Sequence, residues 1–193
     1  MRAESSRKAV QTAAITQRAA IAPAMTYDRL SIGLHWLTAA LVVVLWTLGQ
    51  TIDFFSKGAP KMDARSVHIT LGATLALVLL VRIPWRLSAG RRLPLANSGP
   101  LGITAKLVHY GLYLLVAATV VLGVLNAWQR GDTLFNLYTI PKLVPGDVAL
   151  RRTLQGLHGD FADVVLIVAG LHAAAALTHH YLLRDGVLRR MLP

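Results

Sequence analysis

Cysteine is absent from the 193-residue sequence. Without thiolates, the chain cannot form disulfides, thiolate metal sites or iron–sulfur clusters, and it cannot attach haem covalently through a C-x-x-C-H motif. Any metal chemistry must therefore use His, Asp, Glu or Met side chains.

Acidic residues are also scarce, because nine Asp and Glu oppose 20 Lys and Arg and leave a formal net charge of +11. A basic chain can bind nucleic acid. Here, however, the Lys and Arg residues lie in the segments between apolar runs rather than on one amphipathic surface. This distribution is typical of membrane proteins, so no nucleic-acid partner is expected.

Long apolar runs dominate the sequence, since 54% of the residues are hydrophobic and the mean hydropathy is +0.52. Four stretches approach the roughly 20 residues that cross a hydrocarbon layer as a helix. They are Leu30–Ile52, Val67–Trp85, Leu107–Trp128 and Leu154–Leu183. Short links predict an all-α fold, an integral membrane antiparallel four-helix bundle. The last stretch contains Asp160 and Asp163 near its start, which we expect at or above the membrane interface.

The distribution of basic residues predicts the orientation in the membrane. Thirteen of the 20 Lys and Arg lie in the N-terminal tail, in or beside the middle link, or at the C-terminus. The other seven lie in or beside the other two links. Both termini are therefore expected in the cytoplasm, with residues 53–66 and 129–153 outside. Residues 1–26 contain no uninterrupted apolar run typical of a cleaved signal peptide and are interpreted as a flexible cytoplasmic tail. Residues 27–193 form the transmembrane domain.

Histidines recur along the fourth stretch at a heptad spacing. At about 100° per residue, His158, Val165, His172 and His179 remain near one helix face. His158 and His172 are separated by about 21 Å of helix, so they cannot bind the same metal ion. Each can instead supply one ligand to a separate centre.

Partners for these two histidines are available on the other stretches. Only His68 lies at the depth of His158, whereas either His35 or His109 could face His172. A single intramembrane histidine is often a hydrogen-bonded packing residue. Two pairs of histidines matched in depth indicate a ligand role instead. They predict two b-type haems with imidazole ligands, which need no cysteine. His180 is rotated by about 100° from His179 and is expected to meet lipid headgroups.

Glycines accompany the histidines, and a flat porphyrin between helices needs positions without side chains. The four positions are Gly33, Gly72, Gly159 and Gly170. Glycine is also common in membrane helices because it permits close packing, so no single glycine carries this argument.

Four segments resemble the bacterial cytochrome b561 family, and within it the members that oxidise superoxide and reduce ubiquinone. These are "IGLHWL" around His35, "VHITLG" around His68, "VHYGLYLL" around His109 and the C-terminal "GLHAAAALTHHYLLRDGVLRRMLP". The likeness runs from about Tyr27 to Pro193. It implies that His35 and His172 ligate a cytoplasmic-side haem, that His68 and His158 ligate a periplasmic-side haem, and that His109 and His179 line a ubiquinone site.

The expected function is that of a superoxide:ubiquinone oxidoreductase in which electrons pass through two haems b from the periplasmic side to ubiquinone. Cationic side chains that could attract the superoxide anion flank the outer ligands. They are Lys57, Lys61, Arg65, Arg151 and Arg152. Interfacial anchoring would explain the same charges equally well. An alternative is an electron-transfer cytochrome b subunit that links a dehydrogenase or periplasmic cytochrome to the quinone pool. A metal or proton transporter is a weaker alternative, because we expect such a protein to carry acidic or polar residues in mid-membrane.

Overall fold

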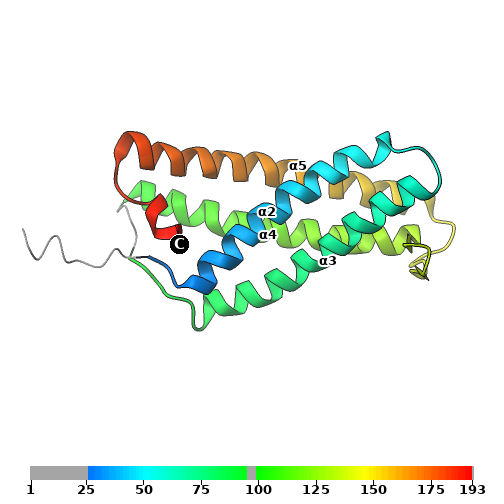
Figure 1. Cartoon of the computed structure of the whole chain (residues 1–193), viewed down its shortest axis with the longest axis horizontal. Helices are drawn as coiled ribbons and strands as arrows, with labels where there is room; N and C mark the ends of the chain where they lie inside the picture. Colours follow the sequence, from blue (N-terminus) through cyan, green and yellow to red (C-terminus); the bar gives the residue numbers. More distant parts are fainter. Residues whose placement is uncertain (1–25, 95–98, 193) are drawn as a thin grey trace, which may run out of the picture.

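Four long helices make up most of the computed structural model, which describes residues 26–94 and 99–192 (Figure 1). They are α2 (Arg29–Thr51), α3 (Ala59–Leu87), α4 (Pro100–Arg130) and α5 (Val148–Thr178). The short elements are η1 (Ile52–Phe54), β1 (Thr133–Leu134), β2 (Tyr138–Thr139), the π-helical turn η2 (His179–Leu183) and η3 (Leu188–Met191). All four long helices are long and apolar enough to cross a membrane, with mean hydropathies of 1.8 to 2.0 in their most apolar windows. The predicted tail lies outside the described residues apart from Thr26.

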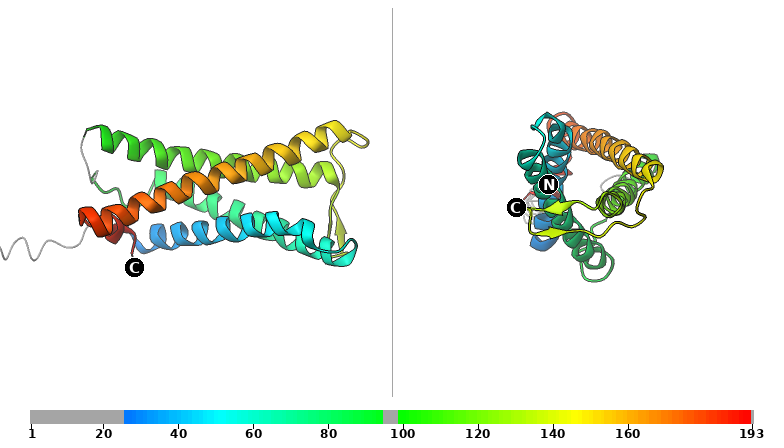
Figure 2. Two further views of the ribbon diagram at one scale, coloured as in Figure 1. Left: turned by 90° about the horizontal axis from the view of Figure 1, so that it is seen from above. Right: turned by 90° about the vertical axis from the view of Figure 1, so that its right-hand side faces the viewer.

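Consecutive helices run antiparallel, and their contacts form a closed ring (Figure 2). Helix α2 contacts α3 and α5, and α4 contacts the same two helices. We call one end of the bundle the terminal end, because Tyr27 N donates to Arg190 O there at 3.0 Å. The opposite end carries the antiparallel β1–β2 pair and is called the hairpin end. The predicted helical bundle is therefore confirmed.

Three helices begin several residues before their apolar stretches, since α5 also starts at Val148 rather than Leu154. Two of the three share a cause. Helix α3 starts at Ala59 rather than Val67, and α4 starts at Pro100 rather than Leu107. Each has a proline in its first turn, where the missing N–H has no intrahelical partner to lose and the fixed φ suits a helix. A helix can also continue into water beyond its apolar segment, so hydropathy alone places its start too late.

The core lies midway between the two ends and is formed by all four helices. Its buried side chains are Leu41, Leu45, Leu75, Val78, Leu79, Val116 and Val165. Val165 is 3% exposed, which confirms that the heptad face of α5 points inward. Large apolar residues such as Leu114 lie on the outside of the bundle. Such a surface suits a lipid environment.

Asp163 connects α5 to α2. It follows His158 by five residues, which places it about 7.5 Å further toward the terminal end. There its Oδ1 accepts hydrogen bonds from Trp46 Nε1 at 2.7 Å and Gln50 Nε2 at 3.1 Å. These charge-assisted hydrogen bonds join α2 to α5. Asp163 therefore stands between the depths of His158 and His172 on α5.

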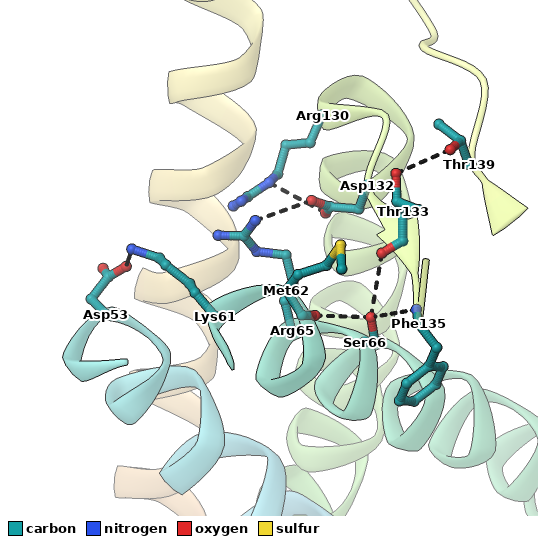
Figure 3. Close-up of polar contacts among 10 residues, drawn as sticks. All are labelled: Asp53, Lys61, Met62, Arg65, Ser66, Arg130, Asp132, Thr133, Phe135 and Thr139. Carbon is teal, nitrogen blue, oxygen red and sulfur yellow. Dashed lines mark hydrogen bonds and ion pairs between the residues drawn. The ribbon is translucent and has the colours of Figure 1, made fainter. Parts of the chain in front are cut away.

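A buried serine fastens the 131–147 link to the hairpin end. Ser66 is 1% exposed, and its hydroxyl lies 2.9 Å from Met62 O and 3.3 Å from Thr133 O while it accepts from Phe135 N at 3.0 Å (Figure 3). Gln129 anchors the other side of the link through Val144. The link is therefore held against the bundle by hydrogen bonds from α3 and α4.

At the terminal end, Asp28 caps helix α2. Its carboxylate accepts from Ser31 N at 2.8 Å, Arg91 N at 3.0 Å and Trp85 Nε1 at 3.1 Å. Burial alone would raise the pKa of Asp28, but these hydrogen bonds outweigh it and hold the pKa well below its usual range. One carboxylate thus connects the start of α2, the end of α3 and the following link.

Candidate functional site

His68 and His158 face each other at the hairpin end. Helices α3 and α5 bring their ring centroids to 6.1 Å with an interplanar angle of 88°. His158 Nδ1 lies 3.0 Å from Thr119 O, and a carbonyl can only accept, so this nitrogen carries the proton. The Nε2 lone pair is then available to a metal, in the arrangement usual for histidine ligands. His68 Nδ1 is buried without a hydrogen-bond partner among the described residues.

Helix α4 shapes the position of the His158 ring. A Cβ added at Gly123 would lie 2.9 Å from His158 Cε1, so only glycine leaves room for this ring. Thr119, which binds the same ring, lies one helical turn earlier. Sequence reasoning missed Gly123, because the contact joins residues 35 positions apart and no spacing within α4 reveals it.

His172 lies between two other histidines at the terminal end. Its ring centroid is 6.4 Å from that of His35 and 5.2 Å from that of His109. Metal–imidazole bonds of about 2 Å put the centroids of two rings on opposite sides of one ion roughly 6 Å apart. The separation of His35 and His172 fits this arrangement, as does that of His68 and His158, whereas His109 is too close to His172. We call His35, His109 and His172 the terminal-end cluster.

Arg82 joins the terminal-end cluster from α3. Its Nη2 lies 3.0 Å from His35 Nδ1, and its Cζ lies 5.0 Å from the ring centroid of Tyr113. A guanidinium can only donate, so His35 Nδ1 accepts in this contact. The sequence interpretation counted Arg82 only toward orientation. A signal was nevertheless present, because Arg82 follows His68 by 14 residues, the spacing that separates His172 from His158.

The residues present fit b-type haem at both depths. A Cβ added at any of the four glycines singled out in the sequence would meet no atom within 4 Å. Among the described residues, no group of three or more His, Cys, Asp or Glu side chains could hold a metal ion. Two facing imidazoles form an incomplete site for a bare ion, whereas haem iron needs only two axial ligands because the porphyrin supplies the others.

His179 lies one heptad beyond His172 and pairs with Asp185. Its Nδ1 contacts Asp185 Oδ2, and Asp185 Oδ1 also accepts from Val187 N at 3.1 Å. Burial alone would raise the pKa of Asp185, but the hydrogen bond from His179 leads the effects that lower it. The pair lies at the π-helical turn, a geometry frequent at functional sites. His180 instead lines a hollow with Tyr181 and three residues of the C-terminal segment, Arg184, Gly186 and Arg189.

Acidic partners bind some of the cationic residues at the hairpin end (Figure 3). Lys61 Nζ lies 2.7 Å from Asp53, so its charge is neutralised locally. Arg65 and Arg130 share Asp132 at 3.4 and 3.3 Å, which leaves one positive charge in excess. The others are exposed and form no ion pair within the described part of the chain, namely Lys57, Lys142, Arg151 and Arg152. Sequence reasoning missed Arg130.

Together, the fold and the histidine pairs define a multi-pass membrane bundle with two candidate sites for haem. Residues 26–193 match the family described as prokaryotic cytochrome b561. The chain therefore belongs to this family of membrane electron-transfer proteins, and membership implies b-type haem.

Curated relatives share this length and family. The chain is 31% identical to the probable superoxide oxidase CybB of Yersinia pestis over 86% of this chain and 96% of that protein. It is 28% identical to cytochrome b561 homolog 2 of Escherichia coli, over 86% and 90%, and 28% identical to cytochrome b562 of Cereibacter sphaeroides, over 86% and 94%. These matches span nearly the full length of each relative.

Proposed function

We propose that this protein is a superoxide:ubiquinone oxidoreductase with two haems b in a bacterial inner membrane. The observation that carries the proposal is the pair of facing imidazoles at each of two depths. In this proposal His68 and His158 hold the haem at the hairpin end, and His35 and His172 hold the haem at the terminal end. The similarity to the probable superoxide oxidase CybB supports superoxide as the electron donor.

The bound haems supply one-electron carriers between the two faces of the bundle. Two superoxide anions each lose one electron and become dioxygen, and one ubiquinone gains two electrons and two protons to become ubiquinol. Thr119 keeps His158 in the tautomer that leaves Nε2 available. The core side chains between the two depths keep water out of this path.

Cationic side chains at the hairpin end attract superoxide in this proposal. The Arg65–Arg130–Asp132 group keeps one excess positive charge, and exposed cations such as Lys57 and Arg151 surround it. A cationic rim raises the local concentration of an anion and its association rate. Lys61 contributes less than its charge suggests, because Asp53 pairs with it.

Side chains at the terminal end deliver protons to ubiquinone in this proposal. The Asp185 carboxylate orients His179, and the imidazole supplies a proton to a quinone oxygen in this proposal. His109 is adjacent to His172 without a ligand role, and it supplies a second polar partner for the quinone. In this proposal, both termini and quinone reduction lie on the cytoplasmic side.

Stopped-flow reduction of the purified protein by superoxide tests this function. Haem reduction should be much faster than that of a free haem control, and added ubiquinone should reoxidise the haems. Reduction no faster than the control would contradict the proposal.

A second candidate is an electron-transfer subunit that accepts electrons from a docked protein. One observation favours it: the hairpin end exposes large apolar side chains, with Leu137 88% and Phe54 86% exposed. Exposed apolar groups of this kind are typical of docking sites. Slow reduction by superoxide combined with rapid reduction by a periplasmic cytochrome or a dehydrogenase would favour this candidate.

A further inference from the structure

We infer that Arg82 binds a propionate carboxylate of the terminal-end haem and raises the reduction potential of that haem above the value it would have without the guanidinium. The inference rests on the proposed function, because it requires two haems at the proposed depths. It concerns a residue of α3 to which that function gives no role.

Arg82 stands at the depth of the terminal-end cluster. It follows His68 by 14 residues on α3, and His172 follows His158 by the same number on α5, so both intervals span about 21 Å. The contact between Arg82 Nη2 and His35 Nδ1 at 3.0 Å shows that the two side chains meet. Helix α3 therefore supplies an imidazole at one depth and a guanidinium at the other.

This guanidinium is half-buried and has no carboxylate partner among the described residues. Two described acids lie at the terminal end: Asp28 accepts hydrogen bonds from Ser31, Trp85 and the Arg91 backbone, and Asp185 is paired with His179. Besides its contact with His35 Nδ1, the guanidinium lies 5.0 Å from the Tyr113 ring, which partly compensates the charge. A charge removed from water is costly unless an anion pairs with it, so this position favours an anionic ligand.

If His35 ligates iron, Arg82 has a stronger need for an anionic partner. A histidine bound through Nε2 carries its proton on Nδ1, as His158 does opposite Thr119. His35 Nδ1 would then be a donor and could no longer accept from Arg82. The guanidinium must find another acceptor, and the haem that His35 ligates brings two carboxylates to this depth. Arginine binds a carboxylate through two parallel hydrogen bonds.

The charge has a consequence for electron transfer. A fixed positive charge near the iron stabilises the reduced state, which carries one positive charge fewer, and it does so more strongly in a low-dielectric interior. Arg82 therefore favours electron flow from the hairpin-end haem to the terminal-end haem.

Redox titration followed by visible spectroscopy tests the inference on purified full-length protein. The variants are Arg82→Gln, Arg82→Lys and the control Arg86→Gln. Arg86 is one turn further along α3, where its Cζ lies 5.1 Å from the centre of the Tyr27 ring and its Nη1 donates to Arg91 O. We expect Arg82→Gln to make one haem about tenfold less reduced at its wild-type midpoint, equivalent to about 59 mV. Arg82→Lys should shift the midpoint potential of that haem much less. Arg86→Gln should leave the midpoint potentials of both haems unchanged.

Infrared redox-difference spectra identify the carboxylate directly. With haem labelled with ¹³C at its propionate carboxylates, the label-sensitive bands should shift in Arg82→Gln and also in Arg82→Lys, which lacks the planar fork. Selective loss of one haem in Arg82→Gln would also support the inference. In that case the infrared bands are measured in Arg82→Lys. Two haems with unchanged potentials and unchanged carboxylate bands in Arg82→Gln would overturn it. Wild-type protein with fewer than two haems would instead refute the proposed function itself.

Discussion

Individual histidines in this bundle differ in role because their neighbours differ. His158 has a backbone carbonyl that fixes its tautomer, His35 has a guanidinium, and His179 has a carboxylate. The same imidazole can thus be a metal ligand in one place and a proton donor in another. Residue-level tests should separate these roles.

Replacement of His68 tests the assignment of depth. We expect His68→Ala to lose the hairpin-end haem and to keep the other, because His35 and His172 lie about 21 Å away along the bundle axis. Haem content by the pyridine haemochrome assay and the visible spectrum of the remaining haem measure this outcome. If both haems disappeared from a folded protein, the two depths would not be independent.

Replacement of His179 tests its role in quinone reduction. His179→Ala should keep both haems and accept electrons from superoxide, but haem reoxidation by ubiquinone should slow by about 100-fold, the lower range for loss of a general acid. His109→Ala should behave similarly. Asp185→Asn should slow reoxidation less, because the histidine remains and loses only the carboxylate that orients it.

Stopped-flow reoxidation of the prereduced variants by ubiquinone measures these rates, with haem content determined in parallel. Loss of a haem in His179→Ala would show that this residue is a ligand. Wild-type reoxidation in both histidine variants would remove them from the quinone site.

At the scale of secondary structure, α4 provides no proposed haem ligand, yet it determines where one ligand lies. Gly123 and Thr119 stand one turn apart beside the same imidazole: the first leaves room for the ring, and the backbone carbonyl of the second accepts a hydrogen bond from it. The helix thus acts as a support for the ligand on α5. Support of this kind is invisible in hydropathy, which registers only that α4 is apolar.

Substitution of Gly123 tests this support. Gly123→Ala should displace the His158 ring, since the new methyl group would lie 2.9 Å from Cε1, and should lower occupancy of the hairpin-end haem at least several-fold. Gly156→Ala is the matched control, because a Cβ there would meet no atom within 4 Å. Haem content per chain measures both. Equal occupancy in the two variants would mean that α4 does not constrain His158.

The whole molecule shows which features a single sequence can predict. Period and hydropathy predicted four helices and the inward face of α5, because each depends on residues close together in the chain; the burial of Val165 confirms that face. The roles of Gly123, Arg82 and Asp185 depend on contacts between distant segments or on the shape of an irregular turn. The pairing of Lys61 with Asp53 likewise became evident only when η1 and α3 were brought together.

Haem stoichiometry is the first prediction for the complete protein. We expect two haems b per chain, both six-coordinate and low-spin, because the proposed arrangement gives each iron two imidazole ligands. Haem and protein quantification, together with electron paramagnetic resonance of the oxidised protein, measure this. A single haem, or a high-spin signal at stoichiometric amounts, would contradict the paired arrangement.

Orientation in the membrane can be tested cleanly because the chain has no cysteine of its own. Ser56 lies exposed in the link between α2 and α3 at the hairpin end, and Ser88 lies exposed after α3 at the terminal end. Since basic residues are retained in the cytoplasm, the terminal end should face inward. A membrane-impermeant maleimide added to spheroplasts should therefore label Ser56→Cys, and it should label Ser88→Cys only after lysis. The reverse pattern would place quinone reduction on the periplasmic side and remove the proposed route for superoxide.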